Sequence, residues 1–202
     1  MFSNSDFKAY RESLGFSSQQ NFKEFLGAKD IKAGIDFAYI ELLNLRLEQI
    51  FTCLNTIYYK PCDIGLFLKE NLIKNYNLMK NNQILEKLNN QGRRKEEVYF
   101  SWMRGFLICE FFKESLRDIF DDQLLLIENI GEDDFTSFNS FKRSPRADLQ
   151  VSQNLRIEMQ SGFQGINDIK EHKVREAKII FYKKKFKPYF YILTFLTDKL
   201  PL

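Results

Sequence analysis

The sequence predicts a mixed α/β (α+β) protein. A helical amino-terminal half is expected to pack on a core of helix, three-stranded β-meander, helix and strand. Apolar residues recur at helical spacing through most of residues 31–118, which is typical of amphipathic helices. Residues 147–160 instead alternate apolar and polar side chains, as half-buried strands do. Residues 188–196 are rich in aromatic and β-branched side chains, which favour a strand.

Length and composition exclude several classes of protein. The 202 residues are 44% hydrophobic and 28% charged, as in a globular chain, and we expect one compact domain with a helical region (1–92) and a core (93–202). The sequence has no apolar run of about 18 residues and no signal-peptide pattern, so we expect a cytoplasmic protein without a membrane partner. Three scattered cysteines and the single His172 argue against a disulfide framework and His-rich zinc sites. Oxygen ligands predominate, which favours a hard ion such as Mg²⁺.

The amino-terminal half should contain three long helices, over residues 31–59, 63–89 and 95–118, behind a peripheral arm of residues 1–30. Pro61 ends the first helix because the residue before a proline avoids helical geometry. The third helix is apolar almost all round, so we expect it to be buried as the spine of the domain.

In the carboxyl-terminal half, residues 123–128 read as a buried strand and residues 131–144 as a loop. Two alternating segments, 147–151 and 155–160, then form a hairpin across residues 152–154. Asp168 and Glu171 have capping-box-like spacing and start a helix that extends to about residue 186. A last strand follows over residues 188–196.

The hairpin brings two carboxylates together. If residues 152–154 are its loop, Val151 pairs with Leu155 and Asp148 lies directly opposite Glu158. Side chains paired in this way lie roughly 4.5–5.5 Å apart at Cβ. Two carboxylates at that distance repel each other unless a cation or a proton lies between them, which makes the pair a candidate metal site. The alternative is a solvated sheet face.

The helix after the hairpin carries lysines on its expected inner side. Its inner stripe is predicted to contain Ile166, Ile169, Val174, Ala177, Ile180 and Phe181. Lys170 and Lys173 fall within that stripe. Unpaired buried ammonium groups are costly, so these lysines either pair with the two carboxylates or extend past the core to solvent.

Charge is unevenly distributed. Residues 142–187 contain twelve Lys/Arg and five Asp/Glu, and this surplus of seven within a chain of net charge +3 indicates a polyanionic partner. Lys183, Lys184, Lys185 and Lys187 are either phosphate contacts or a solvated helix end favoured by the helix dipole.

The hairpin and its flanking elements resemble the PD-(D/E)XK nuclease superfamily, and more narrowly type II restriction endonucleases. Asp148 matches the family's first acid, although Pro145 stands three residues before it rather than one. Glu158 matches the second acid, and Gln160 occupies the usual lysine position, as in a Glu-x-Gln variant. The resemblance covers roughly residues 95–197.

This resemblance implies a Mg²⁺-dependent enzyme that cleaves double-stranded DNA at a short specific site, acting as a homodimer. Asp148, Glu158 and the backbone carbonyl of Met159 would bind the metal, and Gln160 would position the attacking water. Lys173, or else Lys170, would supply the missing positive charge.

The DNA contacts implied by this reading lie in loops and in the basic run. The candidates are Lys142, Arg143, Arg146, Ser161, Gln164, Asn167, Lys183, Lys184, Lys185 and Lys187. Two other functions stay open. One is a nuclease of the same fold that acts in repair, in a mobile element or as a subunit of a larger restriction complex. The other is a non-catalytic DNA-binding or interaction module.

Overall fold

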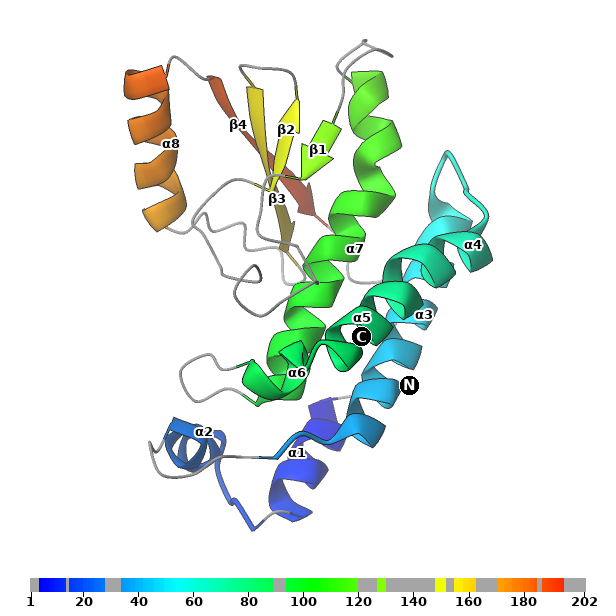
Figure 1. Cartoon of the computed structure of the whole chain (residues 1–202), viewed down its shortest axis with the longest axis vertical. Helices are drawn as coiled ribbons and strands as arrows, with labels where there is room; N and C mark the ends of the chain where they lie inside the picture. Colours follow the sequence, from blue (N-terminus) through cyan, green and yellow to red (C-terminus); the bar gives the residue numbers. More distant parts are fainter. Residues whose placement is uncertain are drawn as a thin grey trace. The chain divides into compact units, whose positions relative to one another are not determined.

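The computed structural model describes residues 4–13, 15–27, 34–88, 94–119, 127–129, 148–151, 155–162, 171–184 and 187–194 (Figure 1). The chain divides into two compact units, residues 1–104 with 200–202, and residues 105–199. The long helix α7 (Lys95–Ile119) runs through the division, so each unit contains part of it. The boundary expected after residue 92 falls outside the described residues.

The described part of the first unit is helical. It contains α1 (Asn4–Ser13), α2 (Gln19–Gly27), α3 (Phe37–Ile57), α4 (Ile64–Leu68), the π-helix η1 (Lys69–Ile73), α5 (Lys74–Asn81), α6 (Ile84–Lys87) and the start of α7. The three long helices expected from periodicity therefore correspond to α3, to the segment from α4 to α6, and to α7.

Helix α3 begins later than predicted. Residues 34–36 are not helical, and Asp36 caps the helix by accepting a hydrogen bond from the Tyr39 N–H at 3.0 Å. An aspartate at this position satisfies one of the backbone donors that lack a partner in the first turn. The predicted start at residue 31 was wrong because apolar residues at helical spacing also occur before the N-cap residue, Asp36.

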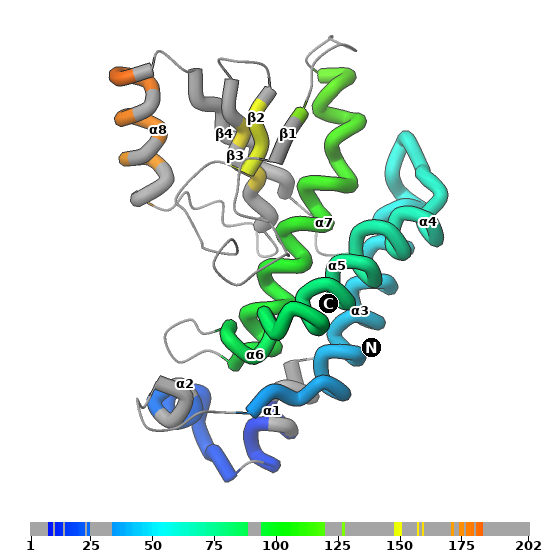
Figure 2. Tube along the Cα trace, viewed as in Figure 1, coloured from blue at the N-terminus to red at the C-terminus, as the bar shows by residue number. Residues whose placement is uncertain are grey.

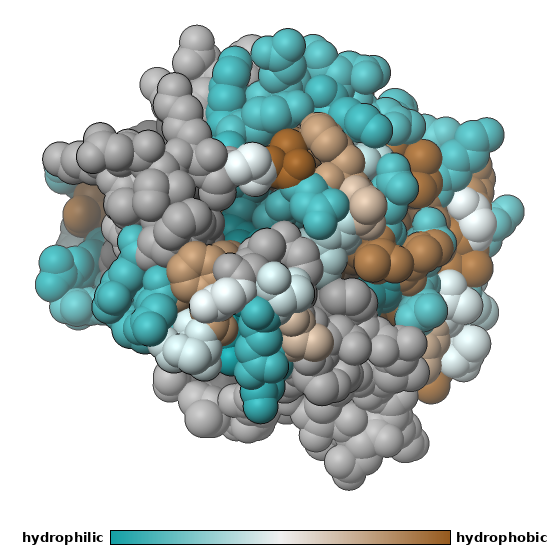
Figure 3. Space-filling view, turned by 90° about the horizontal axis from the view of Figure 1, so that it is seen from below, coloured by the Kyte–Doolittle hydropathy of each residue, from teal (hydrophilic) through white to brown (hydrophobic). Residues whose placement is uncertain are grey.

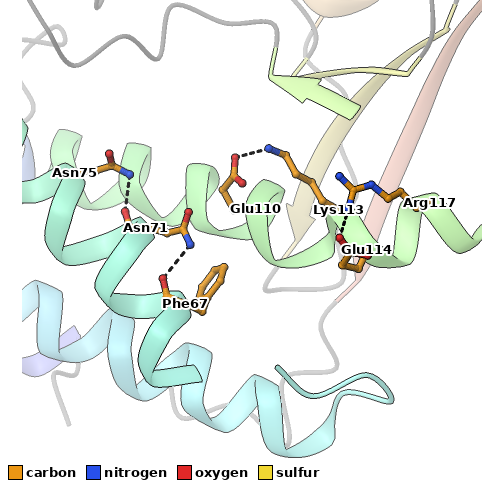
Figure 4. Close-up of polar contacts among 7 residues, drawn as sticks. All are labelled: Phe67, Asn71, Asn75, Glu110, Lys113, Glu114 and Arg117. Carbon is orange, nitrogen blue, oxygen red and sulfur yellow. Dashed lines mark hydrogen bonds and ion pairs between the residues drawn. The ribbon is translucent and has the colours of Figure 1, made fainter. Parts of the chain in front are cut away.

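The single helix predicted over residues 63–89 is instead a chain of segments. The α-helical segment α4 is followed directly by the π-helix η1. Two asparagine side chains in this region donate hydrogen bonds to backbone carbonyls (Figure 4). Asn71 Nδ2 donates to the carbonyl of Phe67 at 2.9 Å, and Asn75 Nδ2 donates to that of Asn71 at 2.7 Å. We infer that these bonds help to satisfy carbonyls where the helical pattern changes.

A break at Gln83 ends this run. Gln83 has φ 55° and ψ 29°, in the left-handed region, and α6 starts directly after it. Left-handed geometry cannot continue a right-handed helix. Gln83 is not among the residues that usually mark such a turn, so the break was not predicted.

The core of the first unit joins α3, α5 and α7. Ile40, Leu43 and Leu47 of α3 are completely buried, and the rings of Tyr76 and Tyr99 lie 5.9 Å apart. The Tyr99 hydroxyl donates to Asn44 Oδ1 at 2.5 Å, and burial raises the pKa of Tyr99 well above its ordinary value. This tyrosine is therefore a neutral core residue.

A buried ion pair lies at the start of α7. Arg94 Nε is 3.3 Å from Glu96 Oε2, and Glu96 Oε1 accepts the Asp36 N–H at 2.7 Å. The Arg94 guanidinium lies 4.5 Å from the ring centroid of Tyr39. These contacts tie the start of α7 to the start of α3.

The described part of the second unit is built on a four-stranded sheet in the order β1 (Ile127–Asn129), β2 (Leu149–Val151), β3 (Leu155–Gly162), β4 (Lys187–Thr194). The pairs β1–β2 and β2–β3 are antiparallel and β3–β4 is parallel, with α8 (Glu171–Lys184) connecting the last two strands. The expected order of helix, three strands, helix and strand is present. Residues 123–126 of the predicted first strand lie outside the described part.

One face of the sheet packs on the second part of α7. Cys109 and Leu116 of that helix form a buried cluster with Ile127, Leu149 and Ile157, one from each of the first three strands. Met159 packs against this cluster. In Figure 1 the sheet lies between α7 and α8, with α8 next to β4.

Helix α7 is buried on most of its length, as expected. Its buried residues include Val98, Tyr99, Met103, Leu107, Ile108, Cys109, Phe111, Phe112 and Leu116. Two ion pairs line its more exposed side, Glu110 with Lys113 at 2.6 Å and Glu114 with Arg117 (Figure 4).

The inner stripe predicted for α8 is only partly correct. Val174 and Ala177 are half-buried, but Phe181 is 49% exposed. At about 100° per residue Phe181 lies on the same side of the helix as Val174 and Ala177, but it is in the last turn of α8. Ile166 and Ile169 lie outside the described residues, as does the side chain of Ile180.

Apolar residues also reach the surface of the first unit. Leu42, Leu45 and Leu66 are about half exposed. In the view of Figure 3, brown apolar patches alternate with teal hydrophilic ones among the described residues.

Candidate active site at the end of the hairpin

The predicted hairpin register is confirmed. Val151 pairs with Leu155, Gln150 with Arg156 and Leu149 with Ile157. One more step along the same register places Asp148 opposite Glu158. Figure 2 shows the two strands of this hairpin side by side.

The carboxylate of Asp148 lies against the backbone of β3. Asp148 is half-buried, in a bend directly before β2, and its Oδ2 accepts the Met159 N–H at 2.8 Å. The β2–β3 ladder ends at Leu149. The Met159 N–H therefore donates to the aspartate side chain and not to a backbone carbonyl of β2. Sequence reasoning did not foresee this bond, because it depends on where the ladder stops.

The bond also fixes the direction of the Met159 carbonyl. In an antiparallel ladder the N–H and C=O of one residue point to the same neighbouring strand. Since the N–H of Met159 points to Asp148, its carbonyl points to the same edge of β3. A carboxylate and a backbone carbonyl, with a glutamate at the adjacent backbone position, form the oxygen-rich donor set that Mg²⁺ prefers.

The backbone of β3 shows on which face of the sheet positions 158 and 160 lie. Leu149, Ile157 and Met159 belong to the face that packs on α7. Because side chains alternate along a strand, positions 158 and 160 belong to the opposite face. The side chains of Glu158 and Gln160 lie outside the described part.

Of the two candidate lysines, only Lys173 belongs to a described element. Its backbone is in the first turn of α8. Arg175, Lys178 and Tyr182 are exposed, and position 173 lies on the opposite side of the helix from them. This is the side of α8 toward the sheet. Lys170 and the side chain of Lys173 are outside the described residues.

Three of the candidate DNA contacts lie near the ends of α8 and β4. Lys183 is exposed in the last turn of α8, Lys184 ends that helix, and Lys187 begins β4. Ser161 is in β3. The remaining candidates lie outside the described part, namely Lys142, Arg143, Arg146, Gln164, Asn167 and Lys185.

No group of three or more His, Cys, Asp or Glu side chains suited to a metal ion occurs among the residues that the structure describes. The donor set at the end of the hairpin does not belong to this class, because it consists of two carboxylates and one backbone carbonyl. None of the described helices is both long enough and apolar enough to cross a membrane.

A scan against protein-family models finds no match, and searches of curated proteins and of solved structures find none either.

Proposed function

We propose that this chain is a Mg²⁺-dependent type II restriction endonuclease of the PD-(D/E)XK type. It would hydrolyse phosphodiester bonds in double-stranded DNA at a short specific site. The element order around the hairpin and the register of its strands support this proposal. The observation that carries it is the position of the Asp148 carboxylate against Met159, at the point where β2 ends.

In this proposal each residue at the end of the hairpin has a distinct task. Asp148, Glu158 and the Met159 carbonyl would hold the ion, and the bond from the Met159 N–H orients the Asp148 carboxylate. Bound Mg²⁺ would activate a water and neutralise charge on the phosphate. The Gln160 amide orients the attacking water but cannot act as its base. Lys173, or Lys170, stabilises the negative charge that develops on the phosphate.

The surrounding charge suits a DNA substrate. Residues 142–187, the segment of the sequence that contains the two carboxylates, carry a surplus of seven positive charges. Such a surplus attracts the phosphate backbone regardless of sequence, whereas specificity requires contacts to base edges. We assign these contacts to residues 136–146 and 161–167. A homodimer in the cytoplasm would match a palindromic site.

The second candidate is a non-catalytic DNA-binding module. The charge surplus of residues 142–187 supports DNA binding in this case too, and the same hydrogen bond would give Asp148 a structural role without any metal. A nuclease of the same fold with a repair or mobile-element task remains a variant of the first proposal.

Digestion of a plasmid of known sequence with purified protein and Mg²⁺, followed by mapping of the ends, tests these readings. Discrete fragments with common end sequences support a restriction enzyme. A smear of fragments supports a nuclease of the same fold without site specificity. Intact plasmid that is nevertheless bound and retarded in a gel supports the non-catalytic module.

A further inference from the structure

The exposed side of α8 combines aromatic and cationic side chains. Tyr182 is 79% exposed and Ile179 is 54% exposed. The ring of Phe181 meets that of Tyr182 edge-on, with centroids 5.5 Å apart. A tyrosine that is this exposed contributes little to the core, so its ring face is available to a partner.

Cations surround this tyrosine on the helix. With Tyr182 at zero, Lys178 and Arg175 fall within about 40° and Lys183 at about 100°. Lys178 and Lys183 are exposed, and Arg175 pairs with Glu171 at 2.6 Å on the same stripe. This side of α8 therefore carries three cations, Arg175, Lys178 and Lys183, against the single carboxylate of Glu171. Its partner should therefore be an anion.

The arrangement favours nucleic acid over a lipid surface. A helix that lies in a membrane interface separates a continuous apolar face from its basic face. On the exposed side of α8, Arg175 and Lys178 share one stripe with Tyr182, and Lys183 lies beside that stripe. Aromatic rings set among cations are the means by which proteins bind unpaired strands, because bases stack on the rings while the cations contact phosphates.

We infer that the outer stripe of α8, formed by Arg175, Lys178, Ile179, Tyr182 and Lys183, binds unpaired nucleic acid strands. Tyr182 stacks on a base, and Lys178 and Lys183 contact the flanking phosphates. A base within an intact duplex offers no free face, so the stripe prefers a single strand. This inference goes beyond the proposed nuclease and does not depend on cleavage.

Fluorescence anisotropy in EDTA tests the inference, with a labelled oligothymidylate of about 20 nucleotides, which is longer than the ~4–16 nucleotides that one OB fold covers. Tyr182→Ala should weaken binding by about tenfold or more, the scale of losing one stacked base, while Tyr182→Phe retains it. Lys178→Gln should reduce the salt slope by about 0.7. Tyr59→Ala is the matched control, because Tyr59 is 66% exposed beside Lys60 in the other unit. It should bind like wild type.

Three results would overturn the inference. The first is Tyr182→Ala binding the oligonucleotide as wild type does. In the second, the variant loses binding to anionic phosphatidylserine vesicles but not to the oligonucleotide. In the third, sedimentation velocity shows that the substitution dissociates an oligomer while binding is unchanged, which would make the stripe an interface between copies. Circular dichroism of each variant confirms that it is folded. Loss of cleavage in an Asp148→Asn variant would leave the inference intact, so the two proposals fail separately.

Discussion

At the scale of single residues, two substitutions of Asp148 separate structure from chemistry. Asp148→Ala removes the acceptor of the Met159 N–H and should lower the free energy of unfolding by about 1 kcal/mol. Asp148→Asn keeps an oxygen that can accept this bond, so its stability should remain within about 0.5 kcal/mol of wild type. Urea denaturation followed by circular dichroism measures both. Equal losses in the two variants would show that the carboxylate charge, and not the acceptor, stabilises the hairpin.

The position of Asp148 was predictable, but its hydrogen bond was not. Apolar and polar residues alternate on both sides of the loop 152–154. Only one pairing register of the two strands fits this pattern, because a shift by one residue would turn every apolar side chain to the opposite face of the sheet. The bond to Met159 depends on β2 starting at Leu149. The sequence does not mark this start of β2, because the alternation of apolar and polar residues already begins at Ala147.

At the scale of elements, the break between α5 and α6 gives a stability test. Gln83 has a positive φ, which costs a residue with a Cβ about 1 kcal/mol relative to glycine. Gln83→Gly should therefore raise the free energy of unfolding by about 0.5–1 kcal/mol. Gln83→Ala keeps the Cβ and should change it by less than about 0.5 kcal/mol. A destabilised glycine variant, measured in the same urea titration, would contradict this account of the break.

Helix boundaries were harder to predict than helices. Apolar spacing identified α3 and α7, since their buried stripes extend over many turns. It did not identify the cap at Asp36 or the π-helix after α4, because apolar spacing there is compatible with an uninterrupted helix. The exposure of Phe181 was not predictable for a different reason. Phe181 lies on the same side of α8 as the half-buried Val174 and Ala177, but in the last turn of the helix, and apolar spacing does not show how much of that turn is covered.

Helix α8 also carries the test of the missing motif lysine. Position 173 lies on the side of the helix toward the sheet. If Lys173 supplies the charge, Lys173→Met should reduce the cleavage rate at saturating enzyme by about 10²-fold or more, the scale of losing one electrostatic stabiliser. Lys69→Met, at an exposed position in the other unit, is the control and should cut normally.

Two further variants complete that comparison. Lys170→Met tests the alternative lysine, and Gln160→Lys restores the family residue. Single-turnover rates on a plasmid substrate measure all of them. Near-normal rates in both methionine variants would show that neither lysine replaces the missing one, which would leave Gln160 as the group that positions the water.

At the scale of the whole molecule, the order of elements was predictable and the division of the chain was not. The helices and the hairpin have their own periodicities, and the first and last strands are marked by a short apolar run and by aromatic and β-branched residues, so the order of elements follows from these patterns. The division between Arg104 and Gly105 falls inside an uninterrupted helix. Within such a helix the sequence contains no linker, such as a stretch rich in Gly, Pro or polar residues, that would mark the boundary between the two units.

The most direct test of the central claim is Mg²⁺-dependent cleavage of a supercoiled plasmid by wild type, Asp148→Asn and Glu158→Gln. Glu70→Gln is the matched control, because it removes one carboxylate from an exposed ion pair with Lys74 in the other unit. We predict cleavage by wild type and Glu70→Gln in Mg²⁺, none in EDTA, and a rate at least about 10²-fold lower in the two hairpin variants. Cleavage in excess EDTA, or a near wild-type rate for Asp148→Asn in Mg²⁺, would contradict the two-carboxylate site.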